Sequence, residues 1–263
     1  MDGVYGVWHG SLAELVSYRY VGCQSVMTDR AHARGWTTVR SHLCSEGSVL
    51  GSVLAISMLD TAGINVDPIY LLALTQIDVQ LYEPGLDVQR YCTIGSVVRE
   101  ARTQVFTECR FEDADRPGHV IGAGAANWTV VAPTQPGFEY TDPGPGFEEG
   151  PGVPAITTAY ELEPMPSGGF VLPELSPRVG ADTLHHGPVL VGLEQAAIDA
   201  AGDRSLALRS MSARILKAGR HAPFVFGAEV LTEGGDVVAS RSQIVDAVGD
   251  TIAVALFAHQ RGG

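Results

Sequence analysis

Two nearly all-apolar segments stand out in a chain that elsewhere alternates between hydrophobic and polar residues. Residues 185–202 keep Glu194 and Gln195 among their few polar positions, and residues 45–63 are mostly apolar up to Asp60. A surface helix shows a single hydrophobic stripe, whereas a helix that is hydrophobic on most faces must be covered on most faces. We therefore predict two central helices, each enclosed by other elements of the fold.

Strand-like runs follow each predicted helix. In residues 75–84, Ile77, Val79 and Leu81 alternate with polar residues, which is the period of a half-buried strand. Four such runs follow each helix, and a short extended piece precedes it. The other runs are 86–98, 102–113 and 119–131 in the first half and 205–216, 221–232, 236–247 and 251–260 in the second, with extended pieces at 36–44 and 168–175.

The same order of elements therefore occurs twice, with the helix starts about 135 residues apart. Between the two copies, residues 131–155 hold six of the fifteen prolines and no Lys or Arg, so they cannot continue a helix or a central strand. We predict an N-terminal repeat at 1–131, a linker at 132–157 and a C-terminal repeat at 158–263. The expected class is α+β, with an antiparallel sheet wrapped around each central helix.

Composition narrows the class of protein. The chain has 263 residues, of which 45% are hydrophobic and 18% charged, so it can bury a large core. Its net charge of −13 argues against a nucleic-acid partner, because phosphate binding needs clustered Lys and Arg. We find no signal peptide and no apolar run long enough to span a bilayer, so we expect a cytoplasmic protein with no membrane partner.

The four cysteines have no spacing typical of a metal site or a redox pair. They are expected to be buried or half-buried free thiols in a reducing compartment. No cluster of His, Asp and Glu has metal-ligand spacing either, so we expect no metal and no redox cofactor. The cysteines are Cys23, Cys44, Cys92 and Cys109.

The start of the second helix and the end of the first carry two short motifs. The second helix opens with His186-Gly187-Pro188 and continues as VLVGLEQAA, and the first ends in SMLDTA around Asp60. Together with the order of elements, these motifs resemble the hotdog-fold acyl-CoA thioesterases of the phenylacetate-pathway type. In that signature, His-Gly-Gly begins the central helix and an acid follows further along. Two copies in one chain resemble the tandem double-hotdog form.

Each half departs from the signature in one place. The first half has Leu50-Gly51-Ser52 where His-Gly-Gly would stand, and the second has Gln195, preceded by Glu194, where the acid would stand. If the halves face each other as the family's subunits do, Asp60 and Gly187 build one complete site, and Gly51 with Gln195 builds a degenerate one. We therefore expect one working site per chain.

The resemblance implies hydrolysis of an acyl-CoA or acyl-carrier thioester. The first N–H groups of a helix have no partners within the helix and carry partial positive charge, so they can stabilise an oxyanion. Asp60 would act as general base or nucleophile, the Gly187 N–H would polarise the carbonyl, and His186 would shape the helix start. When the halves are aligned on their helix glycines, Asp60 falls one residue past the position of Gln195. One residue rotates a side chain by about 100°.

Five further residues are expected near the substrate, of which CoA would be a part. Arg99 and Arg102 lie in a basic turn typical of these thioesterases, although a solvated turn is the simpler interpretation. His186 could equally cap its helix, and Asp60 could hydrogen-bond a neighbouring strand. The substrate-binding candidates are Thr75, Glu194, Gln195, Arg99 and Arg102.

Two other functions stay open. A degenerate double hotdog could bind acyl-CoA without hydrolysing it. A hydratase or dehydratase would need Asp and His close together with Asn and Pro between them, and the chain has no such stretch. The expected partner is a small acyl-CoA molecule, and a homodimer of double hotdogs is a candidate assembly.

Overall fold

The computed structural model describes residues 15–84, 87–134, 150, 152–180 and 182–261. Most of the linker predicted at 132–157 lies outside these described residues, as do residues 1–14. Within the described part of the chain, no helix is long and apolar enough to cross a membrane.

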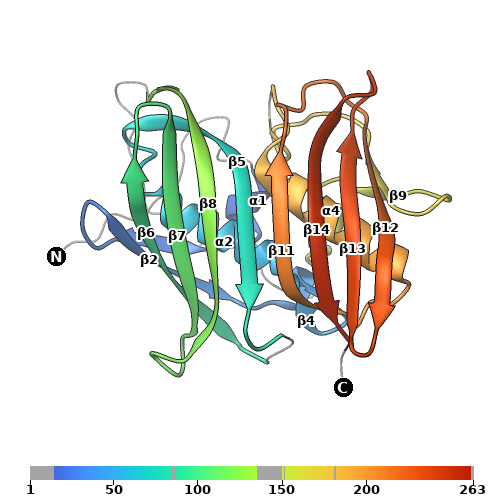
Figure 1. Cartoon of the computed structure of the whole chain (residues 1–263), viewed down its shortest axis with the longest axis horizontal. Helices are drawn as coiled ribbons and strands as arrows, with labels where there is room; N and C mark the ends of the chain where they lie inside the picture. Colours follow the sequence, from blue (N-terminus) through green and yellow to red (C-terminus); the bar gives the residue numbers. More distant parts are fainter. Residues whose placement is uncertain (1–14, 85–86, 135–149, 151, 181, 262–263) are drawn as a thin grey trace.

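One antiparallel sheet of twelve strands dominates the structure (Figure 1). Its order is β1-β2-β6-β7-β8-β5-β11-β14-β13-β12-β10-β9, which is the same sequence of strands read outward twice from the β5–β11 junction. The strands are β1 (Gln24–Met27), β2 (His32–Thr38), β5 (Tyr70–Leu81), β6 (Arg90–Glu100), β7 (Gln104–Asp113), β8 (Val120–Pro133), β9 (Glu163–Pro164), β10 (Phe170–Leu172), β11 (Ala207–Ile215), β12 (Phe224–Gly234), β13 (Val237–Val245) and β14 (Thr251–Gln260).

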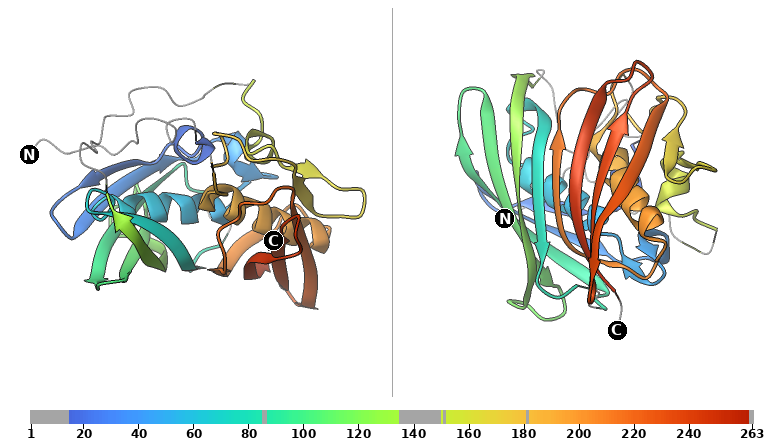
Figure 2. Two further views of the ribbon diagram at one scale, coloured as in Figure 1. Left: turned by 90° about the horizontal axis from the view of Figure 1, so that it is seen from above. Right: turned by 45° about the vertical axis from the view of Figure 1, so that its right-hand side comes forward.

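Two long helices, α2 (Gly51–Gly63) and α4 (His186–Ala201), lie side by side on the same face of this sheet (Figure 2). The sheet curves around them, so each helix is covered by the strands of its own half. The short helices α1 (Val16–Arg19) and α3 (Ile156–Ala159) pack near α4. This burial explains why both helices are hydrophobic on most faces.

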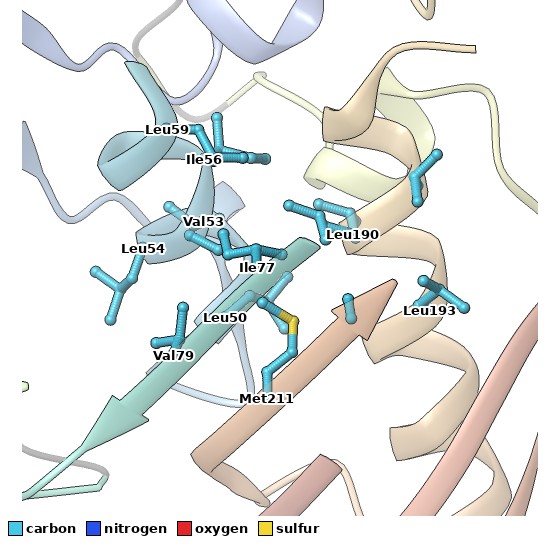
Figure 3. Packing of buried hydrophobic residues seen from close by; sticks show 14 of the residues in the cluster. Leu50, Val53, Leu54, Ile56, Leu59, Ile77, Val79, Leu190, Leu193 and Met211 are labelled. Carbon is cyan, nitrogen blue, oxygen red and sulfur yellow. The ribbon is translucent and has the colours of Figure 1, made fainter. Parts of the chain in front are cut away.

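The two halves share one hydrophobic core across the β5–β11 junction. Antiparallel pairing joins these two strands from Gln76↔Arg214 to Gln80↔Ser210. Side chains of α2, α4, β5 and β11 meet above the junction (Figure 3), and burying each of them contributes roughly 1.5–3 kcal/mol. At this junction lie Val53, Ile56, Ile77, Leu190 and Met211, each at most 2% exposed.

The four strands predicted after each helix and the second helix are confirmed, most closely at β14, whereas the extended piece predicted at 36–44 overlaps β2 only up to Thr38 and continues into a short 3-10 helix at Ser41–Leu43. Helix α4 ends where Gly202 adopts a left-handed conformation with φ 66°, as its glycine suggests. The first helix begins later than expected, at Gly51 rather than near residue 45. Glu46 and Gly47 have φ values of 43° and 94°, which form a tight turn between β3 (Cys44–Ser45) and β4 (Ser48–Val49) and cannot start a helix.

Candidate active site

A cavity of about 220 Å³ brings Asp60 of the first half together with the start of α4 in the second. Five of its eleven lining residues are apolar side chains from α2, β5 and β8, and the two histidines at the start of α4 also line it. We call it the inner cavity. Its lining consists of Tyr18, Ile56, Leu59, Asp60, Asp67, Leu71, Leu72, Trp128, Thr183, His185 and His186.

Asp60 is the one residue of α2 that is not fully buried. Its Oδ2 atom accepts a hydrogen bond of 2.6 Å from the Ser25 hydroxyl. Burial raises the pKa of this carboxyl from 3.8 to about 6, although hydrogen bonds from Ser25 and Cys23 act in the opposite direction. Asp60 is therefore ionised at neutral pH while keeping a proton affinity suited to a general base.

The histidines at the start of α4 lie against each other, with ring centroids 3.8 Å apart. His185 is the N-cap residue, and its Nδ1 accepts from the Gly187 N–H at 3.3 Å. Burial lowers the pKa of His185 to about 4, and burial together with its neighbour lowers the pKa of His186 well below 6.5. Both rings are neutral at neutral pH, so they contribute hydrogen-bonding groups rather than charge.

His186 faces the cavity and keeps its donors unused. Its ring meets the edge of Trp128, with centroids 6.2 Å apart. Among the described residues, neither its ring nitrogens nor its backbone N–H has a hydrogen-bond partner. The first amide of α4 therefore has no acceptor within the described part of the protein, as is usual at the start of a helix. The sequence interpretation included His186 but missed His185, whose place directly before the helix is the signal of an N-cap.

The structure gives Gly187 a different setting from the one expected. Its N–H already has an acceptor in the His185 ring. A Cβ at this position would lie 2.0 Å from the Ser17 hydroxyl and 2.4 Å from the Tyr160 hydroxyl. The glycine thus allows close packing against the protein interior, not the approach of a ligand. To donate to a ligand, the Gly187 N–H would have to give up its hydrogen bond to His185.

A second, more open cavity of about 540 Å³ adjoins the first. We call it the outer cavity, and it shares Leu72, Thr183, His185 and His186 with the inner cavity. Thr75 lines the outer cavity, and its hydroxyl donates to the Asn127 carbonyl at 2.9 Å. The two histidines therefore stand between the two spaces.

The opposite pair of helix ends is closed. The Glu194 carboxylate accepts from the N–H groups of Gly51, at 2.9 Å, and Ser52, at 2.7 Å. It is 1% exposed, and Nε2 of the buried His259 lies 3.8 Å from Oε1. In place of the expected Gly51–Gln195 pairing, the structure brings Glu194, the residue before Gln195, to this helix start. Glu194 caps α2 and occupies the first two amides of that helix.

The other expected substrate-binding residues lie elsewhere. Gln195 lines a separate cavity with Leu50 and Arg204. Arg99 is at the exposed end of β6, and Arg102 is in the turn between β6 and β7. Neither arginine lines the inner or the outer cavity. Within the described ranges, no group of three His, Cys, Asp or Glu side chains could hold a metal ion, and all four cysteines are free thiols.

Comparison with known proteins shows similarity in structure but not in sequence. No protein-family model matches the chain, and no curated protein matches it. A tesB protein of Mycobacterium avium subsp. paratuberculosis has a TM-score of 0.61 at 14% identity, covering 97% of this chain and 100% of that one. An acyl-ACP thioesterase from Bacteroides thetaiotaomicron has a TM-score of 0.58 at 12% identity, covering 87% and 98%.

A third solved structure names the fold directly. It is a protein of Alicyclobacillus acidocaldarius described as having a hot dog fold, with a TM-score of 0.55 at 12% identity, covering 94% of this chain and 98% of that one. Identities this low carry the fold and no more. Together with the curved antiparallel sheet around its central helices, these similarities show that the chain has an α+β hotdog fold.

Proposed function

We propose that this chain is a tandem double hotdog, with repeats at 1–131 and 158–263 joined by the segment 132–157. The strand order supports this division, because six strands on one side of the β5–β11 junction correspond in order to six on the other. Each side also has one buried helix that directly precedes its four long strands. Two such units in one chain form the equivalent of a dimer.

We further propose that the inner cavity hydrolyses an acyl thioester. The observation that carries this proposal is that Asp60 and His186, whose backbone N–H has no acceptor among the described residues, line the same cavity. A carboxylate with a raised pKa supplies the base, and a helix start supplies donors for an oxyanion. Solved thioesterase structures resemble this chain in fold at low sequence identity, and that similarity agrees with the proposed chemistry.

In the proposed reaction, the thioester carbonyl oxygen accepts from the His186 N–H, where the helix dipole adds partial positive charge. Asp60 removes a proton from water as the water oxygen bonds to the carbonyl carbon. The C–S bond then breaks, and the proton passes from Asp60 to the leaving thiolate. The products are a carboxylic acid and a free thiol. Direct attack by Asp60, through an anhydride that water then cleaves, is the alternative course.

The two cavities suggest how a substrate is divided. The inner cavity has apolar side chains in its wall and fits an acyl group. The outer cavity is open to solvent and includes Thr75 and Lys217, and it fits the polar arm of CoA or of a carrier protein. Contacts of Arg99 and Arg102 with CoA phosphates, a homodimer of double hotdogs and a cytoplasmic location stay predictions.

The direct test measures thiol release from short, long and aromatic acyl-CoAs by the wild type and by Asp60→Asn. We expect hydrolysis by the wild type and a loss of roughly 10²–10⁴-fold in kcat in the variant, the usual contribution of a general base. The variant removes a buried charge, so its fold should be intact by circular dichroism. Asp199→Asn is the matched control, because it makes the same change at an exposed carboxylate of α4 that lines neither cavity.

Three results would contradict this proposal in different ways. Full activity in Asp60→Asn would reject Asp60 as base and nucleophile. Tight binding of acyl-CoA with no thiol release from any substrate would favour a non-catalytic acyl-CoA-binding protein. Addition of water to an enoyl-CoA without thiol release would favour a hydratase.

A further inference from the structure

A chain of buried hydroxyl groups leads from the sheet to Asp60. Ser25, on β1, lies 2.6 Å from the Asp60 Oδ2 and 3.0 Å from the Thr61 Oγ1. Thr61 in turn lies 2.6 Å from the Thr93 Oγ1 on β6. The three hydroxyl residues are at most 1% exposed. Buried polar groups of this kind are placed where they satisfy one another.

The direction of these hydrogen bonds follows from counting protons. A carboxylate can only accept, so Ser25 gives its single hydroxyl proton to Asp60. Ser25 therefore has no proton left for Thr61, and it accepts a hydrogen bond from the Thr61 hydroxyl. Thr61 has then used its single hydroxyl proton, so it accepts from the Thr93 hydroxyl. All three dipoles therefore point their positive ends toward Asp60, an arrangement in which each bond strengthens the next.

The backbone around the chain leaves room for it. Gly35, on β2, lies directly beneath the hydroxyls. A Cβ there would come within 2.2 Å of the Thr61 Oγ1, 2.5 Å of the Thr93 Oγ1 and 2.9 Å of the Cys23 sulfur. The backbone conformation of Gly35 does not require glycine. Glycine is needed here because any side chain would overlap the hydroxyl cluster. The cluster is thus built into the packing of β1, β2, β6 and α2.

We propose that Ser25 is a positioning residue for Asp60, holding the Oδ2 atom so that the other oxygen faces the inner cavity. This inference rests on the proposed hydrolysis only for its effect on rate. Ser25 does not touch the substrate. It acts through Asp60, by fixing the orientation of the carboxylate and by favouring the ionised form that a base requires.

Other titratable groups also surround Asp60. Cys23 approaches from the segment before β1, and burial raises the pKa of its thiol to about 12, so it is neutral. Across the cavity stand Tyr18 of α1, Asp67 after α2, and the neutral His185 and His186. None of these described groups is a cation that could stabilise the Asp60 carboxylate. A neutral donor, Ser25, is therefore the main group that opposes the effect of burial.

The test compares the pH dependence of kcat/KM for the wild type, Ser25→Ala and Ser25→Cys. Loss of the donor should raise the pKa of Asp60, so the acid limb should move to higher pH by about one unit in Ser25→Ala. Ser25→Cys keeps a side chain of similar shape with a weaker hydrogen-bond donor, so the acid limb of its pH profile should shift less. The plateau value of kcat/KM should fall by roughly tenfold in Ser25→Ala because the Asp60 carboxylate is no longer held in one orientation.

Ser57→Ala is the matched control. Ser57 is also a buried hydroxyl of α2, and its hydrogen bonds go to the Thr37 hydroxyl and the Val53 carbonyl rather than to Asp60. Its loss should reduce stability without moving the acid limb. An equal shift in Ser57→Ala and Ser25→Ala would mean that general loosening of α2 causes the effect, and it would overturn the proposal.

Carbon-13 NMR titration of the Asp60 carboxyl, assigned by its absence in Asp60→Asn, tests the same point without activity. An upward shift of the titration in Ser25→Ala, in a protein that hydrolyses no thioester, would uphold the positioning role and reject the proposed function. An unchanged titration and an unchanged pH profile in an active, folded Ser25→Ala protein would reject the positioning role alone. If Ser25→Ala fails to fold, Ser25→Cys decides by the same two measurements.

Discussion

Each central helix begins near a carboxylate carried by the other helix, and the two places differ in how that carboxylate is held. Glu194 reaches the start of α2 and binds two amides with both of its oxygens. Asp60 is held by Ser25 from the side, and the start of α4 remains across a cavity from it. One carboxylate completes a helix, whereas the other leaves the helix donors to a ligand.

The anchor of the carboxylate makes the difference. A longer side chain directed at the amides satisfies them and excludes everything else, which stabilises the fold. A shorter side chain that is bonded to a hydroxyl on the sheet cannot satisfy those amides. The histidine cap partly replaces it at α4, because His185 accepts from the Gly187 N–H, whereas the His186 N–H before it has no acceptor among the described residues. The comparison separates a helix start that stabilises the fold from the helix start at which we propose hydrolysis.

Replacing Glu194 with Ala should have the largest effect on stability. It leaves the N–H groups of Gly51 and Ser52 buried without acceptors, and the lost charged hydrogen bonds cost about 3 kcal/mol in the free energy of unfolding. Urea unfolding followed by circular dichroism measures this, and Glu194→Gln should lose less because one oxygen remains. The hydrolytic activity of the folded fraction should be unchanged. A fully stable Glu194→Ala protein would contradict the capping role.

Asp60 should have the opposite influence on stability, and its sign depends on pH. Its pKa is raised in the folded state, so its stabilising contribution is complete below about pH 4 and is lost as pH rises through about 6. Asp60→Asn should therefore equal or exceed the wild type in stability above pH 6, by about 2 kcal/mol or less. Urea unfolding at pH 4, 6 and 8 measures the difference. A variant that is less stable than wild type at pH 8 would contradict this interpretation.

The smallest effect is expected at the cap of α4. His185→Ala removes the acceptor for the Gly187 N–H and should lower the free energy of unfolding by about 1 kcal/mol, as at other N-caps. His185→Asn supplies a favoured cap and should restore most of this loss. Thermal unfolding of the two variants makes the comparison. Equal losses in both would show that packing of the ring against His186, not capping, stabilises the helix start.

Much of the fold was predictable because it depends on patterns that are local in the sequence. Alternation located β5, and a nearly all-apolar run with Gly202 after it located α4. The late start of α2 was missed because it depends on the backbone conformation of Glu46 and Gly47, and a glutamate with positive φ has no clear sequence signal. The similar order of elements in the two halves pointed to the correct fold despite sparse identity.

The candidate site was predictable only in part. Asp60 and His186 were expected in one site, and the structure places both at one cavity. The choice between Glu194 and Gln195 turns on about 100° of helix rotation, which alignment of two short motifs cannot settle. Ser25 lies in a separate strand, and its contact with Asp60 exists only after β1 has packed on α2. Contacts between distant segments of this kind leave no local pattern.

The pairing of β5 with β11 within one polypeptide has an evolutionary consequence. Two identical subunits joined at the same place must carry every substitution twice, so a mutation that fills one pocket fills both. A covalently duplicated chain is free of that symmetry. Glu194 could enter one helix start, and Asp60 could stay at the other, because each position is encoded once. In the proposed tandem arrangement, asymmetry between the halves is therefore expected, with the proposed hydrolytic site at one helix start and the other helix start made part of the scaffold by Glu194.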